Sequence, residues 1–218
     1  MLLNIVYEKD TRKIRQDFVD VNQNAKQTSP SINTLFNTRD KVSNIVVNLI
    51  DAVSYLNETT ELLATSVSKN SHNIFTINNL KSALMEIAGY NSQNTKSLKL
   101  SKELSASEDY EEKVTKNVRL FFEELKNNKY IADIMYNLHS KNPAAIPVIR
   151  NSNVLTSGTG IIVAARVAGK FVEIAENEQQ LKEYFRQIVQ FNWSRENYVF
   201  ANNIIGDENK ILNSREAI

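Results

Sequence analysis

With 218 residues, 42% of them hydrophobic, and only five glycines and three prolines, the chain is long enough to bury a core and its composition favours long helices. The absence of cysteine excludes disulfides, thiolate nucleophiles and zinc sites of the cysteine type. The 26 basic and 25 acidic residues nearly cancel and are spread along the chain, so the charge pattern carries no strong nucleic-acid signal.

The N-terminal stretch "MLLNIVY" is apolar, but charged residues begin at Glu8, too early for the hydrophobic region of a signal peptide. This stretch predicts a first strand or the lead-in to a helix. No part of the chain approaches the roughly 18 to 20 apolar residues that a membrane-spanning helix needs. We therefore expect neither a signal peptide nor a transmembrane segment, and a cytoplasmic or virion- and assembly-associated location.

Two helices are predicted on either side of Pro30. Apolar residues spaced four, three and four apart from Ile14 to Ala25 indicate a helix over about residues 7–27. After Pro30 an apolar residue recurs at every seventh position, which predicts one long helix over residues 31–69, or to residue 88 if the polar stretch 66–73 does not end it. The repeated positions are Leu35, Val42, Leu49, Leu56 and Leu63.

Shorter helices follow the loop after Gly89. Apolar spacing predicts a helix or a broken pair of helices over residues 98–125, and the acidic residues that follow Ser107 suit the positive end of a helix dipole. Another short helix, "KYIADIMYNLHSK", is stopped by Pro143. We interpret residues 1–142 as a helical bundle.

The pattern changes over residues 143–176. Four runs rich in β-branched residues, "IPVIR", "NVLT", "GIIVAARV" and "KFVEIA", are separated by short polar or glycine-containing breaks, which predicts a small antiparallel β-meander. Asn177, with Gln180 three residues later, resembles a capping box that opens a C-terminal helical segment over residues 177–218. A last short helix is expected after Gly206.

The glycine-rich stretch 157–170 is the one candidate phosphate loop. Gly169 and Lys170 stand where a P-loop needs them, but Ala164 replaces its first glycine and Phe171 replaces the hydroxyl that holds magnesium. A hairpin turn is therefore the favoured interpretation. His72 and His139 are far apart in sequence, and a hydrolase built on Ser157 and His139 has little support. We expect no cofactor, no metal and no catalytic residues.

The segment 184–200 combines six aromatic residues with two arginines, the usual anchors of protein interfaces. Its aromatic residues exceed what one helical face can bury, so some are expected to contact another element or another subunit. The predicted interface residues are Phe191, Trp193, Arg195, Tyr198 and Phe200, together with Ile162, Arg166 and Phe171 of the meander.

These features predict a mainly α fold: a multi-helix bundle with one long heptad-patterned helix and a small antiparallel meander before the C-terminal helices. The predicted function is a non-enzymatic structural or assembly subunit, such as a virion or secretion-machine component, in a homo-oligomer or a larger protein assembly. Two alternatives stay open. One is a pore-forming protein that inserts the hairpin 161–174, and the other is a nucleotide-binding protein or enzyme that uses the stretch 157–170.

Overall fold

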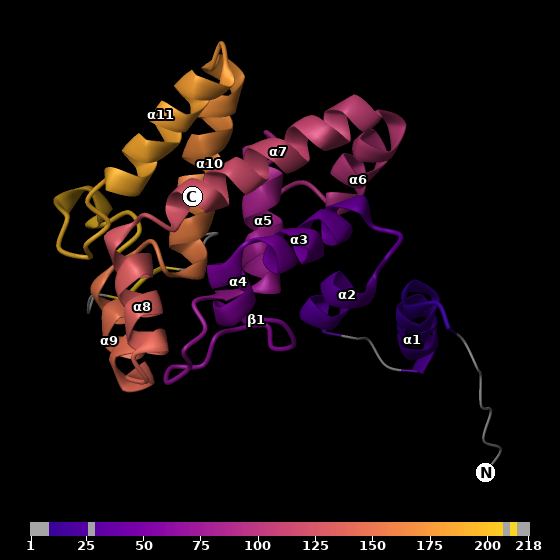
Figure 1. Cartoon of the computed structure of the whole chain (residues 1–218), viewed down its shortest axis with the longest axis horizontal. Helices are drawn as coiled ribbons and strands as arrows, with labels where there is room; N and C mark the ends of the chain where they lie inside the picture. Colours follow the sequence, from indigo (N-terminus) through magenta and orange to yellow (C-terminus); the bar gives the residue numbers. More distant parts are fainter. Residues whose placement is uncertain (1–8, 26–28, 207–209, 213–218) are drawn as a thin grey trace.

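The computed structural model describes residues 9–25, 29–206 and 210–212 (Figure 1). Over these residues the chain is mainly helical, as predicted. The predicted N-terminal strand, and most of the helix expected after Gly206, lie outside the described residues. The helices are α1 (Thr11–Ala25), α2 (Pro30–Phe36), α3 (Lys41–Ala52), α4 (Ser54–Thr59), α5 (Ile77–Ile87), α6 (Ser97–Ala106), α7 (Glu108–Leu125), α8 (Lys129–His139), α9 (Ile146–Ser152), α10 (Gly158–Ile174) and α11 (Glu178–Gln190). The other elements are the strands β1 (Thr60–Glu61) and β2 (Phe75–Thr76) and the 3-10 helices η1 (Pro143–Ala145) and η2 (Tyr198–Phe200).

The predicted long helix over residues 31–69 is wrong, because the structure divides this stretch into α2, α3 and α4. Asp40 begins α3, since its carboxylate accepts a hydrogen bond from the backbone N–H of Val42 at 3.2 Å and caps a new helix. Val53 is extended (φ −109°, ψ 105°) and separates α3 from α4. Beyond Thr59 the chain leaves the helical path, and Leu63 is 58% exposed. The seven-residue repeat therefore reflects several short helices that each pack on the core.

The predicted antiparallel meander over residues 146–175 is also wrong, because this stretch forms α9 and α10. Ser157 caps α10 by accepting a hydrogen bond from the Gly160 N–H at 2.9 Å. Ile161, Ala165 and Ala168 are buried at four- and three-residue spacing, as on the inner face of a helix. The sheet of the described residues is instead the parallel pair β1 and β2, in which Thr60 is aligned with Phe75.

Two glycines of α10 serve close packing between elements. A Cβ atom at Gly160 would lie 1.9 Å from the carbonyl oxygen of Val154. One at Gly169 would lie 2.2 Å from the carbonyl oxygen of Glu86 on α5. The glycines that suggested turns therefore let α10 approach its neighbours at backbone distance.

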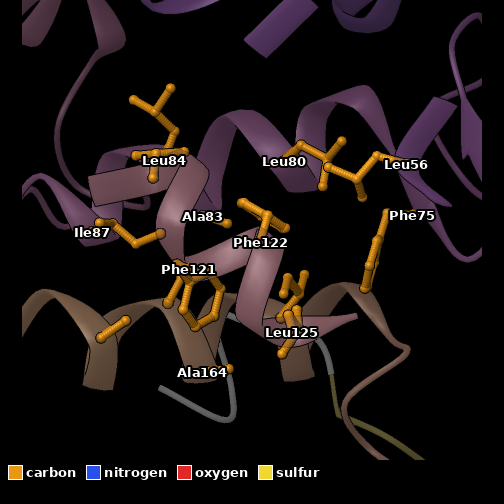
Figure 2. Packing of buried hydrophobic residues seen from close by; sticks show 14 of the residues in the cluster. Leu56, Phe75, Leu80, Ala83, Leu84, Ile87, Phe121, Phe122, Leu125 and Ala164 are labelled. Carbon is orange, nitrogen blue, oxygen red and sulfur yellow. The ribbon is translucent and has the colours of Figure 1, made fainter. Parts of the chain in front are cut away.

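The core lies around α5, which packs against α3 and α10. Figure 2 shows side chains of α4, α5, α7 and α10 meeting in this core, among them Leu56, Ala83, Phe121 and Ala164. The Phe121 ring packs edge-on against the Phe185 ring of α11, with ring centroids 5.4 Å apart. This contact joins α11 to the helices that carry the rest of the core.

A buried ion pair also links α10 to α5. The Arg166 guanidinium donates from Nε and Nη2 to the two carboxylate oxygens of Glu86, at 2.9 and 3.0 Å. Burial alone would raise the pKa of Glu86, but the hydrogen bonds from Arg166 and Ser92 outweigh it and hold that pKa below its usual value. The Glu86 side chain is 3% exposed, so this pair fixes the register of α10 on α5.

Candidate binding groove

An apolar groove lies between α10, α11 and the chain that follows α11. Figure 1 shows α11 beside α10, with the following segment at the end of the pair opposite the connecting turn. The groove encloses about 390 Å³. Of the residues that line it, only Gln187 has a polar side chain capable of pairing with a fixed polar ligand. Its lining is Val163, Val167 and Phe171 of α10, Gln187 and Ile188 of α11, and Phe191, Trp193, Val199, Phe200 and Ile204 beyond it.

The floor of the groove is an aromatic cluster of Phe191, Trp193 and Phe200. The rings of Trp193 and Phe200 are stacked with centroids 5.8 Å apart, and Phe191 meets Trp193 edge-on at 5.4 Å. Trp193 and Phe200 are nearly fully buried, whereas Phe191 is 41% exposed. The cluster therefore joins the core below to a partly exposed apolar surface.

Backbone and side-chain hydrogen bonds hold this segment in place. The Trp193 indole N–H donates to the Ile188 carbonyl at 2.8 Å, which folds the chain back after α11. The Trp193 carbonyl accepts from the Val154 N–H at 2.8 Å, next to an antiparallel bridge between Asn153 and Ser194. The groove therefore has a preformed wall.

The rim of the groove carries exposed apolar side chains. Val167 on α10 and Val199 on η2 are 41% and 45% exposed. Val167, Val199 and the partly exposed Phe191 all line the same groove, so these exposed apolar side chains are gathered at one place on the surface. Exposed apolar side chains that gather in this way are typical of a binding surface.

The structure brings together half of the predicted interface residues. Phe171, Phe191, Trp193 and Phe200 line the groove, although they come from two separate parts of the chain. Phe171 is also stacked on Tyr184 of α11, with centroids 4.7 Å apart.

The other four predicted interface residues lie outside the groove. Ile162 is 6% exposed and packs into the core, and Arg166 is engaged with Glu86. Tyr198 is exposed on η2 without lining the groove, and Arg195 lines a different cavity. The inward positions of Ile162 and Arg166 follow from α10 being a helix, since the side chains of a helix do not alternate as those of a strand do.

Sequence reasoning missed Val163, Val167 and Val199. Val163 and Val167 are four residues apart and share one face of α10, a spacing that a helical interpretation would have shown. Val199 lies in η2, where Asn197 caps the short turn by accepting a hydrogen bond from the Val199 N–H.

The residues that the sequence offered for phosphate binding or hydrolysis make structural contacts instead. Lys170 pairs with Glu173 at 3.0 Å in the C-terminal half of α10, whereas a P-loop lysine stands at the start of its helix. Ser157 caps α10, and His139 contacts Glu58 at 2.7 Å. Among the residues that the structure describes, no group of three His, Asp or Glu side chains is placed to hold a metal ion.

The structure is that of a mainly helical protein with an apolar groove between α10, α11 and the segment after α11. Comparison with protein-family models gives the family: residues 3–218 match the model DndB, described as DNA-sulfur modification-associated. The chain therefore belongs to the DndB family. Searches of curated proteins and of solved structures gave no match.

Family membership corrects the predicted function. A virion or secretion-machine subunit is wrong, because the family is associated with sulfur modification of DNA. The balanced charge carried no strong nucleic-acid signal, so overall composition did not reveal the association of the family with DNA. The pore-forming alternative is wrong as well, because residues 161–174 belong to α10 and pack on α5. No helix in the described ranges is both long and apolar enough to span a bilayer.

Proposed function

We propose that this chain is an accessory component of a DNA-sulfur modification system, and that its groove binds an apolar helical segment of another protein of that system. The observation that carries the proposal is the groove between α10 and α11, in a chain whose family acts in DNA-sulfur modification. An accessory role does not require chemistry in this chain. It requires a surface that recognises a partner.

The lining favours a protein segment over a small molecule. Small-molecule pockets combine apolar walls with a few converging polar groups that fix the orientation of the ligand. Here Gln187 is the one amide among aliphatic and aromatic side chains. A groove between two helices that offers almost entirely apolar contacts suits the apolar face of an amphipathic helix.

The aromatic floor would supply most of the affinity. Interface energy concentrates in a few buried aromatic anchors, and truncating such an anchor costs about 2 kcal/mol or more. Phe191 is suited to this role because it is already ordered by Trp193 and Phe200 but keeps an exposed face. A partner would therefore gain contact area at a small entropic cost.

The test is a Val167→Asp substitution. It places a carboxylate on the exposed rim of the groove, and a partner could then bind only by burying an unpaired charge. Val148→Asp is the matched control, because Val148 is a helical valine, 70% exposed on α9, that does not line the groove. The assay is co-purification of each tagged variant with the co-expressed proteins of the same modification system, followed by titration with the purified partner.

We expect wild type and Val148→Asp to bind the partner equally, and Val167→Asp to bind at least about tenfold more weakly. Equal binding by all three would refute the groove as the docking site. Light scattering tests whether the groove instead binds a second copy of this chain. In that case the wild type would be a dimer and Val167→Asp would be a monomer.

A further inference from the structure

Gln187 has the one side chain of the described groove lining whose hydrogen-bonding groups are not already in use. The other side-chain donor of the lining is the Trp193 indole N–H, and it donates to the Ile188 carbonyl at 2.8 Å. Within the part of the chain that the structure describes, the Gln187 amide makes no hydrogen bond. The groove therefore offers one free amide in a wall of aliphatic and aromatic side chains.

Two other glutamines of α11 are paired within the protein. The Gln179 amide donates to the Glu183 carboxylate at 3.0 Å, and Gln180 accepts from the Glu176 backbone N–H at 2.7 Å. Both amides stabilise the first half of α11. Gln187 lies about two turns further along the helix and lines the groove. Its amide is therefore available to a segment that fills the groove.

Filling the groove changes the surroundings of this amide. Gln187 is exposed, so its amide is hydrated while the groove is open. A helix that occupies the groove removes this hydration. A buried amide without a partner costs more than one hydrogen bond contributes, and the affinity falls by about fivefold to a hundredfold. A segment that presents only hydrocarbon groups opposite Gln187 is therefore penalised.

The lining also indicates which group the partner should place there. None of the described residues that line the groove is charged. A charged partner side chain would thus be buried without a counter-ion, which is costly. An amide suits the position, because it has two donors and an acceptor and can pair reciprocally with the amide of Gln187. The chemistry of the wall favours Asn or Gln at this point of the partner.

We propose that Gln187 is the specificity-determining residue of the groove, and that the partner helix carries one Asn or Gln within its apolar face to pair with it. This inference rests on the proposed function, in which the groove binds a helical segment. Apolar contacts discriminate weakly between similar apolar segments, whereas a site that requires a hydrogen bond rejects segments without the matching group. One amide in an apolar seam also fixes the register of packed helices, as in coiled coils.

Gln187→Leu tests the proposal in the full chain, because leucine is of similar size and has no hydrogen-bonding group. Gln190→Leu is the matched control, since Gln190 is an exposed glutamine of the same helix that does not line the groove. It measures any effect of adding an exposed leucine to α11. Val167→Asp is measured beside them to show whether the partner occupies the groove. Circular dichroism and thermal melts establish that each variant is folded.

The probe is the protein of the modification system that co-purifies with wild type, titrated by calorimetry. We expect Gln190→Leu to bind it like wild type and Gln187→Leu to bind it about tenfold or more weakly. The direction of the change is informative, because an entirely apolar partner face would gain contact area from leucine and bind Gln187→Leu more tightly.

A double-mutant cycle identifies the partner's amide. Each Asn and Gln of the partner's binding helix is replaced by leucine in turn. One of these variants should bind wild type about tenfold or more weakly, yet bind Gln187→Leu within about threefold of the wild-type pair, because replacing both members of a hydrogen bond by apolar groups is nearly neutral.

The outcomes separate this inference from the proposed function. Equal or tighter binding by Gln187→Leu, with binding still weakened by Val167→Asp, would overturn the role of Gln187 and leave the groove as the docking site. Equal weakening by Gln187→Leu and Gln190→Leu would show a general effect of leucine on α11 and contradict the proposal. Equal binding by Val167→Asp and wild type, or no co-purifying protein of the system, would overturn both.

Discussion

Replacing Gly169 with alanine has two effects of opposite sign on the stability of the folded protein. In the middle of a helix, alanine is favoured over glycine by about 1 kcal/mol. In this structure, however, the added Cβ atom would lie 2.2 Å from the Glu86 carbonyl oxygen, a backbone atom that a change of rotamer cannot move. Overpacking of this kind costs about 1–3 kcal/mol, and a rigid backbone neighbour places the cost at the upper end. We therefore expect Gly169→Ala to lower the free energy of unfolding by about 2 kcal/mol.

Thermal unfolding followed by circular dichroism measures this effect. For a chain of this size, 2 kcal/mol corresponds to a fall in Tm of about 4–8 °C. Lys170→Ala is the control, since Lys170 is exposed and loses only a surface ion pair with Glu173. A Gly169→Ala protein more stable than wild type would refute the close approach of α10 to α5.

Three further changes test the same packing. The pKa of Glu86 is lowered in the folded state. The ionised Glu86 therefore contributes fully to stability at pH values above the usual pKa of a glutamate, and this contribution is lost as the pH falls through the lowered pKa. Tm should therefore fall more steeply in acid for wild type than for Glu86→Gln. At neutral pH Glu86→Gln should cost about 3 kcal/mol, because Arg166 loses its partner, and urea unfolding measures this loss. Phe121→Ala, at a fully buried site, should cost about 3–5 kcal/mol in the same assay. Ser157→Ala removes the cap of α10 and should cost about 1 kcal/mol, and a change below the error of the melt would argue against that cap.

Local signals in the sequence predicted several helices correctly. Ser107 with the acidic residues after it marks the start of α7, and its hydroxyl accepts from the Tyr110 N–H as a cap should. Asn177 likewise caps α11. Both signals depend on residues within one helical turn, so they can be recognised without knowledge of the tertiary structure.

The errors arose where one pattern suits two structures. A seven-residue apolar repeat is compatible with one long helix or with short helices packed on a common core, and the cap at Asp40 decided for the second. A β-branched run with glycines suits strands and turns, but Ala165 and Ala168 pack at helical spacing, and Gly169 meets the backbone of α5. Only the contact across elements distinguishes a packing glycine from a turn glycine.

Only one side of the candidate groove could be predicted from the sequence. The aromatic cluster around Phe191 was predictable, because it lies within ten residues of chain and exceeds one helical face. The α10 side of the groove was not, since an incorrect strand assignment placed its side chains on the wrong faces.

The sulfur content of cellular DNA tests the central claim most directly. Mass spectrometry of digested DNA would be compared between cells with the chain, cells without it, and cells complemented with Val167→Asp or Val148→Asp. The account predicts that loss of the chain changes the amount or distribution of sulfur-modified nucleotides, that wild type and Val148→Asp restore it, and that Val167→Asp does not. Identical DNA sulfur with and without the chain would contradict a role in DNA-sulfur modification, and restoration by Val167→Asp would contradict the groove.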